Sequence, residues 1–181
     1  MRIVAGEWRG RAIKAPPGDT TRPTADRTRE TLFNMLASRL GSFEGLSAAD
    51  LFAGSGALGL EALSRGCASC LFVEEDKRAV DTIRANVATL GAGTRSAIQQ
   101  ASVMRLGPAK APHDLILLDP PYGTNAGAVA LDRLVRLGWI GPATWIALEV
   151  SAKEQVVLRG VAADAERKVG KAKLLLLRLA Q

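Results

Sequence analysis

Short apolar runs alternate with segments of helical periodicity between residues 46 and 150, and this alternation restricts the fold more than any other feature. The pattern predicts strands at residues 46–52, 69–74, 96–101, 114–119 and 144–150. It predicts helices from the glycine-rich loop after residue 53 to about residue 65, at 77–90, and at about 126–137. Elements in this order form a mostly parallel sheet with helices on both faces, so we expect a Rossmann-like α/β fold.

The N-terminal part of the chain has a different character. Residues 2–5 and 11–14 are short β-like pieces, which predict a hairpin. A linker rich in Pro, Gly and Thr follows at 16–23, and Thr24 can cap a helix that runs to about Leu40.

The C-terminal tail predicts a second hairpin. Its last strand, at residues 174–179 after Gly170, is expected to run antiparallel at or near the edge of the sheet. We therefore divide the chain into a small basic hairpin with its linker at 1–22 and a main domain at 23–181.

Length and composition are those of a folded globular chain. The 181 residues are 48% hydrophobic and 23% charged, which is enough to bury a full core. The N-terminus lacks the apolar segment of a signal peptide, and no run approaches the roughly 18 apolar residues of a membrane span. We therefore expect a cytoplasmic protein, and we take it as a monomer.

The net charge of +6 is concentrated at the two ends of the chain. Residues 1–29 hold seven basic and three acidic residues, and residues 153–181 hold the same numbers. Residues 30–152 hold ten basic and twelve acidic residues. Basic ends around a slightly acidic middle suit a polyanionic partner, although a solvated basic surface would give the same count.

Basic and aromatic residues of the first 29 positions are candidate nucleic-acid contacts. They are Trp8, Arg9, Arg11, Lys14, Arg22, Arg27 and Arg29. Cations at the start of a helix oppose its dipole, so an anionic ligand is a plausible partner for the last three. Trp8 could instead pin the hairpin to the body, and Asp26 or Glu30 could pair with the arginines.

The segment Gly54-Ser55-Gly56-Ala57-Leu58-Gly59 fits the pattern G-x-G-x-x-G between a strand and a helix. Glu74 lies 20 residues after Gly54, at the end of the next strand, where its carboxylate can accept both hydroxyls of a ribose. Asp50, four residues before Gly54, suits an ammonium better than a pyrophosphate. These acids favour S-adenosylmethionine over a nicotinamide dinucleotide as the cofactor.

The stretch Asp119-Pro120-Pro121-Tyr122 ends an apolar strand with an acid, two prolines and an aromatic ring. The prolines give a stiff loop whose carbonyls have no competing N–H groups. Such a loop suits a planar amine, such as the exocyclic amine of a nucleobase. Because ligands of parallel sheets sit at the carboxyl ends of strands, we expect Asp119 and Ser102 to border the cofactor together with the glycine loop.

No metal site is expected. Cys67 and Cys70 lack two further ligands, and the sole histidine, His113, lies far away in the sequence. Two small buried residues are the preferred interpretation, and a redox pair is conceivable.

With these residues in place, the chain resembles the class I S-adenosylmethionine-dependent methyltransferases. It is most similar to the bacterial RsmD family, which methylates the N2 amine of a guanine in 16S ribosomal RNA. The resemblance rests on MRIVAGEWRGR at the start, RPTADRTRETLFNML at 22–36, DLFAGSGALGLEALSRG at 50–66, FVEED at 72–76 and LLDPPYG at 117–123.

The resemblance implies specific roles for residues of this chain. Cofactor contacts fall on Asp50, Gly54, Gly56 and Glu74, and contacts to the target amine on Asp119, Pro120 and Tyr122. Ser102 stands where family members often carry Asn or Asp, at a position expected to bind the adenine amine. The substrate implied is 16S rRNA, either as free RNA or within an assembling 30S particle.

Three other functions fit parts of the pattern. An adenine-N6 methyltransferase acting on DNA would use the same Asp-Pro-Pro-Tyr loop. A nicotinamide-dependent oxidoreductase would use the glycine loop for a pyrophosphate. A noncatalytic RNA-binding assembly factor could retain the fold alone.

Overall fold

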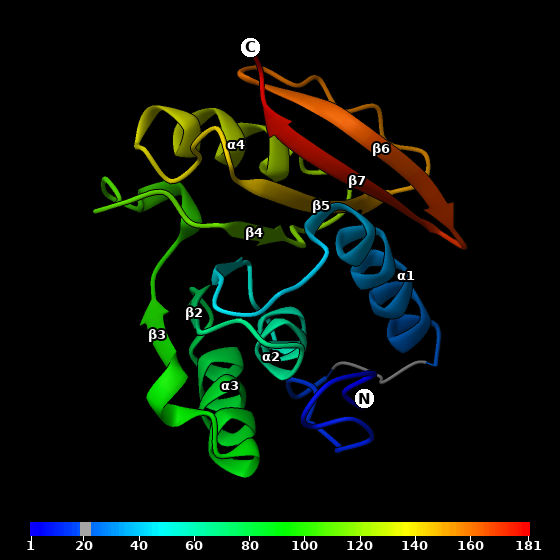
Figure 1. Cartoon of the computed structure of the whole chain (residues 1–181), viewed down its shortest axis with the longest axis vertical. Helices are drawn as coiled ribbons and strands as arrows, with labels where there is room; N and C mark the ends of the chain where they lie inside the picture. The colour runs from blue at the N-terminus through cyan, green and yellow to red at the C-terminus, as the bar shows by residue number, and fades with distance from the viewer. Residues whose placement is uncertain (19–22) are drawn as a thin grey trace.

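The computed structural model describes residues 1–18 and 23–181, which fold around a central sheet (Figure 1). In this part of the chain seven strands form one sheet in the order β3-β2-β1-β4-β5-β7-β6. The strands are β1 (Ser47–Leu51), β2 (Ser69–Glu74), β3 (Ser96–Gln100), β4 (Leu115–Leu118), β5 (Trp145–Ser151), β6 (Val161–Val169) and β7 (Ala172–Leu179). The helices are α1 (Pro23–Leu40), α2 (Ala57–Ser64), α3 (Lys77–Leu90) and α4 (Ala126–Arg136).

The first five strands are mutually parallel, and β7 pairs antiparallel with both β5 and β6. The predicted Rossmann-like fold with an antiparallel C-terminal strand is therefore confirmed. Predicted and observed limits of the regular elements differ by one or two residues. The predicted C-terminal hairpin is formed by β6 and β7, but the sequence predicts no bounds for β6, an edge strand with mostly exposed side chains whose sequence VAADAERKV lacks an apolar run.

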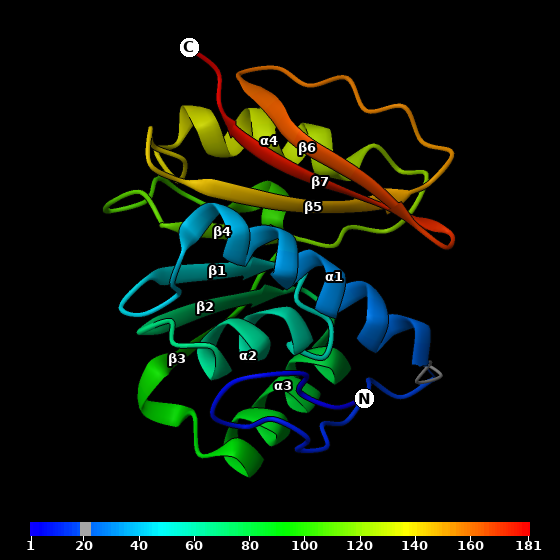
Figure 2. The same cartoon turned by 45° about the vertical axis from the view of Figure 1, so that its right-hand side comes forward.

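Two hydrophobic clusters lie on opposite faces of the sheet. In β4 the side chains of Leu115 and Leu117 join the cluster formed with α1, α2 and α3. Ile116 and Leu118 join the cluster formed with α4. All four are completely buried, because a central parallel strand is covered on both faces. Figure 2 shows α1 in front of the sheet and α4 behind it.

The N-terminal segment packs into the first of these clusters. Ile3, Trp8 and Ile13 are buried there, together with residues of α1 and α2. Its two predicted strands are reduced to one isolated antiparallel bridge, between Arg2 and Ala12. Backbone bonds join the two halves near Ile3, which donates to Arg11 and accepts from Gly10, and at the Ile13 N–H, which donates to Met1. Between Val4 and Trp8, four N–H groups donate to Glu61 and Ser64 of α2 instead.

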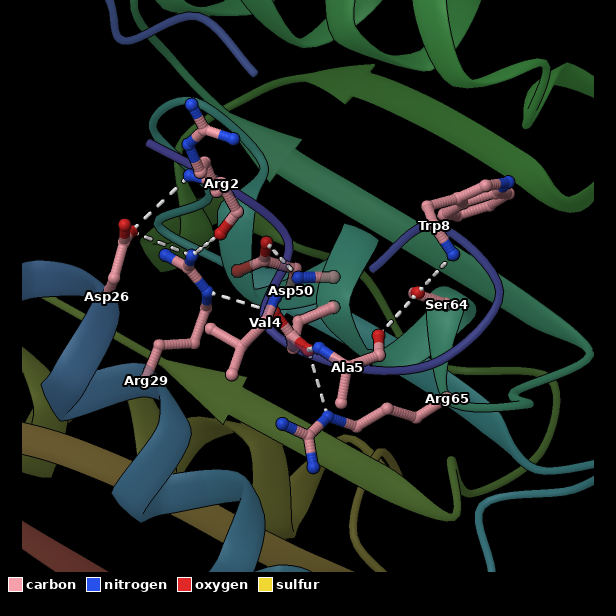
Figure 3. A network of polar contacts seen from close by, with 11 residues as sticks. Arg2, Val4, Ala5, Trp8, Asp26, Arg29, Asp50, Ser64 and Arg65 are labelled. Atoms are coloured by element: carbon pink, nitrogen blue, oxygen red, sulfur yellow. Dashed lines mark hydrogen bonds and ion pairs between the residues drawn. The ribbon is translucent and has the colours of Figure 1, made fainter. Parts of the chain in front are cut away.

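The carboxylate of Glu61, on α2, receives these bonds. Its two oxygens accept the backbone N–H groups of Val4 at 2.9 Å and Ala5 at 3.0 Å. They also accept the Nε–H groups of Arg29, on α1, at 3.1 Å and of Arg65 at 2.9 Å. Glu61 is completely buried, so four donors compensate the burial of its charge. Figure 3 shows this network linking the N-terminal segment, α1 and α2.

Further contacts extend the network on both sides. The Arg29 guanidinium pairs with Asp26 at 2.9 Å and donates to the carbonyl of Arg2. The hydroxyl of Ser64 donates to the Ala5 carbonyl at 2.7 Å and accepts the Trp8 backbone N–H at 3.0 Å. The first residues of the chain are thus part of the folded core.

We predict that Glu61→Gln destabilises the protein by about 3 kcal/mol, because breaking a buried ion pair leaves an uncompensated charge. A glutamine offers one oxygen to four donors, leaves the Arg65 guanidinium without its counter-charge, and leaves Arg29 with Asp26 as its one remaining counter-charge. Urea unfolding followed by tryptophan fluorescence measures the difference. Glu30→Gln, on the exposed side of α1, is the matched control and should change the unfolding free energy little. Equal effects of the two substitutions would contradict this role of Glu61.

Candidate active site

A large cavity lies at the carboxyl ends of the parallel strands. The strand order reverses between β1 and β4, and ligands of open α/β sheets bind at such a switch point. The cavity has a volume of about 1420 Å³, more than the roughly 300–1,000 Å³ of a typical small-molecule pocket. The predicted residues that line it are Gly54, Ser55, Glu74, Ser102, Asp119, Pro120, Tyr122, Arg27 and Arg29.

The glycines of the loop have separate roles. Gly54, with φ of 58°, leaves open space where a Cβ would stand, so a ligand can approach the backbone there. Gly56 is the N-cap of α2 and has φ of 83°. A Cβ on Gly59 would lie 2.4 Å from the ring of Phe72, so this glycine allows α2 to pack closely on β2. Gly56 and Gly59 therefore act on the side of the loop away from the cavity, where they set the start of α2 and its packing on β2.

Glu74 is fixed beside this loop. One carboxylate oxygen accepts the backbone N–H of Gly54 at 2.9 Å, and the other accepts that of Asp76 at 2.9 Å. Each carboxylate oxygen has a further lone pair, so the side chain can still accept the hydroxyls of a ribose. Ser102 precedes a short 3-10 turn, and its hydroxyl accepts the Met104 N–H at 3.2 Å. The orientation of Glu74 is thus set by the protein itself.

Asp50 lies within β1, as predicted, and its side chain is enclosed by the protein. It is 1% exposed and lies behind the glycine loop, where one oxygen accepts the Gly59 N–H at 2.9 Å. The other oxygen is buried without a hydrogen-bond partner. Burial raises the pKa of Asp50 from 3.8 to about 8, against the lowering effect of the Gly59 hydrogen bond, and the charge of Glu74 adds to the rise. Asp50 thus lies beneath the loop and not among the described residues that line the cavity, and its pairing with an ammonium, directly or through water, stays a prediction.

We predict that Asp50 makes stability fall as the pH rises. Its pKa is higher in the folded state than in the unfolded one, so the folded state holds the proton more tightly. This contribution is complete below about pH 4 and is lost as the pH rises through 8, by up to about 1.4 kcal/mol per unit. Asp50→Asn removes the titration and should flatten this part of the profile. Parallel pH profiles of unfolding free energy for the two proteins would contradict the prediction.

The Asp119-Pro120-Pro121-Tyr122 loop leaves β4 at the same edge of the sheet. The Tyr122 hydroxyl donates to Glu149, on β5, at 2.7 Å, while its side chain remains 47% exposed. Behind the loop, the backbone N–H of Gly123 donates to Glu154 at 2.6 Å. The loop is therefore fastened at its tip and presents an aromatic ring toward solvent.

The pKa values of three neighbouring groups are raised, those of Asp119 and Tyr122 in this loop and that of Glu149 on β5. Asp119 is open to the cavity but enclosed by protein on its other sides, and this desolvation raises its pKa well above the usual value. The charges of Glu149 and Asp50 raise it further. Burial also raises the pKa of Glu149, and burial with the Glu149 hydrogen bond raises that of Tyr122. Tyr122 is thus a neutral donor at ordinary pH.

Sequence reasoning missed several residues of the site. Glu149 is an isolated acid in the apolar strand WIALEVS, two residues before its end, and this could have marked it. Phe52 lines the cavity with φ of 60°, a left-handed conformation unusual for a residue other than glycine. Backbone strain of this kind gathers at ligand sites.

The candidate nucleic-acid contacts fall into two groups. Arg9, Arg11, Lys14 and Arg27 are exposed, and Arg11 donates to the carbonyl of Thr89 at 2.8 Å. Two residues require correction, because Trp8 is 6% exposed and Arg29 is 4% exposed. Trp8 packs in the core beneath the Arg95 guanidinium, and Arg29 is held by the Glu61 network. Arg22 lies outside the described residues.

Other chemistry-bearing side chains lie away from the cavity. Cys67 and Cys70 are buried free thiols, as expected, and burial raises the pKa of each. His113 stacks on Trp139 at the amino end of β4, and burial lowers its pKa. Within residues 1–18 and 23–181 no cluster of His, Cys, Asp or Glu side chains is arranged to hold a metal ion. None of the helices described is long and apolar enough to cross a membrane.

Comparison with known proteins defines the class of the fold first. A solved structure of yhhF from Escherichia coli covers 100% of this chain and 99% of its own, with a TM-score of 0.84 and 36% identity. A methylase of ribosomal protein L11 from Lactobacillus delbrueckii shares the fold at a TM-score of 0.68, covering 95% of this chain and 87% of that one at 18% identity. The fold is that of the class I methyltransferases.

The family follows from the sequence comparisons. Residues 1–178 match the family model described as Conserved hypothetical protein 95. Ribosomal RNA small subunit methyltransferase D of Escherichia coli is 38% identical over 82% of this chain and 74% of its own length. A Bacillus subtilis relative, described as an rRNA methyltransferase named YlbH, is 41% identical over 67% of each chain. The chain belongs to this family, the RsmD family.

Proposed function

We propose that this protein transfers a methyl group from S-adenosylmethionine to the N2 amine of a guanine in 16S rRNA, in the cytoplasm and as a monomer. The observation that carries the proposal is that Gly54, Glu74 and Asp119 line one cavity at the switch point of the sheet. The names of the relatives, rRNA methyltransferases of the small subunit, support the substrate. The volume of the cavity is sufficient for a cofactor together with a nucleobase.

The residues present fit an adenosine-containing methyl donor. Gly54 leaves space against its backbone, and Glu74 is fixed with free lone pairs that suit ribose hydroxyls. Ser102 borders the same side of the cavity and can accept a hydrogen bond from an adenine amine, because its hydroxyl has two lone pairs. S-adenosylmethionine would supply a methyl group on a sulfonium, which reacts by in-line displacement.

The Asp119-Pro120 unit would orient the target amine. An exocyclic amine delocalises its lone pair into the ring, which makes it a poor nucleophile. Hydrogen bonds from its N–H groups to the Asp119 carboxylate and the Pro120 carbonyl favour a pyramidal nitrogen and stabilise the positive charge that develops. The raised pKa of Asp119 also makes it a better acceptor for the proton that the amine loses. Tyr122 offers its exposed ring to a base turned out of its stack.

The acids of the site favour guanine over adenine. Asp119 and Glu149 lie close enough for the charge of Glu149 to raise the pKa of Asp119. Guanine presents two adjacent donors, N1–H and the N2 amine, which two carboxylates can accept. Adenine presents an acceptor at N1 beside its N6 amine, and a carboxylate facing that acceptor would be repelled. This difference separates the proposal from an adenine-N6 methyltransferase acting on DNA.

Methyl transfer from labelled S-adenosylmethionine tests the proposal. The substrates are 16S rRNA, small ribosomal subunits from cells lacking this gene, and duplex DNA. We expect label in guanine of the rRNA or the subunits and none in the DNA. Asp119→Asn should reduce turnover about 10³-fold, as expected for loss of an electrostatic group, and should leave cofactor affinity nearly unchanged. Label in adenine, or near wild-type turnover of Asp119→Asn, would refute the proposal.

The pH dependence of turnover gives a second prediction. Turnover requires the ionised form of Asp119, so it should fall as the pH decreases through the raised pKa of that group. Glu149→Gln keeps an oxygen for the Tyr122 hydroxyl but removes the negative charge that raises this pKa. The acidic limb of the pH–rate profile should therefore shift to lower pH. Glu75→Gln, at an exposed lining position, is the control, and an unshifted limb in Glu149→Gln would contradict the coupling.

A further inference from the structure

The turn between β6 and β7 lies beside the candidate active site. Ala172 pairs with Val169 on β6 and with Ser151, the last residue of β5. The turn therefore sits at the carboxyl edge of the parallel strands, where the glycine loop and Asp119 also lie. Val169, Gly170, Lys171 and Ala172 line the cavity. Figures 1 and 2 both show this turn and the start of α1 on the same side of the molecule.

The turn is strongly basic and its cations are free. Arg167, Lys168 and Lys171 are exposed, and within the described part of the chain none of the three forms an ion pair. The nearby Glu166 is paired with Lys173 at 3.5 Å, so its charge is already compensated. Arg167 lies on the same face of β6 as Val169, because side chains of a strand alternate with a period of two. Because Val169 lines the cavity, Arg167 lies on the face of β6 that is turned toward the cavity.

The cavity is therefore lined by both acidic and basic side chains. Asp119 and Glu149 line it together with two exposed cations, Lys171 of the turn and Arg27 of α1. A small metabolite of uniform charge would match only one of these regions. A nucleic acid matches both, because a base carries the amine that the carboxylates accept and its backbone carries the phosphates that the cations bind.

We propose that the β6–β7 turn is a phosphate-binding element that holds the RNA strand at the rim of the cavity, with Arg167 and Lys171 as its contacts. This inference rests on the proposed function. It adds a second phosphate-binding region, in the C-terminal hairpin, to the candidate contacts of the N-terminal segment. The turn positions the strand, while Asp119 and Pro120 engage the base.

The double variant Arg167→Ala/Lys171→Ala tests this inference. Its matched control is Lys110→Ala/Arg159→Ala, which removes one lysine and one arginine at exposed positions. These two residues precede β4 and β6, at the amino ends of the strands and away from the turn. Thermal unfolding and the affinity for S-adenosylhomocysteine should be unchanged in both. Initial rates are measured on small ribosomal subunits from cells lacking this gene, and binding to protein-free 16S rRNA is measured over a series of KCl concentrations.

We expect the test variant to raise KM for the subunits about tenfold with little change in kcat. The slope of log affinity for 16S rRNA against log salt should fall by about 1.4–1.8, the value for two phosphate contacts. The control should stay within twofold of the wild type. A test variant indistinguishable from the control overturns the inference, as does a raised KM with an unchanged salt slope, which would indicate contact with a ribosomal protein. If the wild type methylates neither substrate, the proposed function itself fails.

Discussion

The buried carboxylate of Glu61 is the interaction on which the rest of the structure depends. It lies on α2, the helix that begins at the glycine loop, and it accepts two backbone N–H groups of the N-terminal segment and two arginine Nε–H groups. Because a buried charge is tolerated only when it is paired and hydrogen-bonded, these donors must stay in place. The N-terminal segment, α1 and the cofactor loop therefore hold fixed positions relative to one another. This arrangement also sets Arg27 at the opening of the cavity.

The site combines acidic side chains that differ in burial and in hydrogen bonding, all at the carboxyl ends of the parallel strands. Glu74 is fixed by two backbone N–H groups and remains open to the cavity, whereas Asp50 is sealed beneath the glycine loop with one unpaired oxygen. Burial raises the pKa of both Asp119 and Glu149, and the charge of Glu149 raises that of Asp119 further. A positively charged ligand would favour ionisation of these groups, so binding of a sulfonium and deprotonation of an amine reinforce one another. Exposed cations, Arg27 and Lys171, line the same cavity, as the proposed contact with phosphates requires.

The sequence predicts the fold well because most strands are short, apolar and bounded by breakers, and the glycine loop and Glu74 stand at a diagnostic spacing. It fails where tertiary contacts decide. The sequence predicts Trp8 and Arg29 as contacts to an anionic partner. In the structure Trp8 is buried in a hydrophobic cluster, and Arg29 donates to the buried carboxylate of Glu61. Asp50 is enclosed beneath the glycine loop, where it accepts the N–H that Gly59 donates from the first turn of α2. Glu149 joins the site only because β5 lies next to β4, a neighbour relation that local pattern does not encode.

The central claim is that Asp119 and its loop present a guanine amine to a methyl donor. Mass mapping of methylated nucleotides in ribosomal RNA, from cells with this gene, without it, and with only the Asp119→Asn form, tests it most directly. The account predicts that one N2-methylguanine of 16S rRNA is present with the intact gene and absent in the other two. Identical methylation in all three, or loss of a methylated adenine instead, would contradict it.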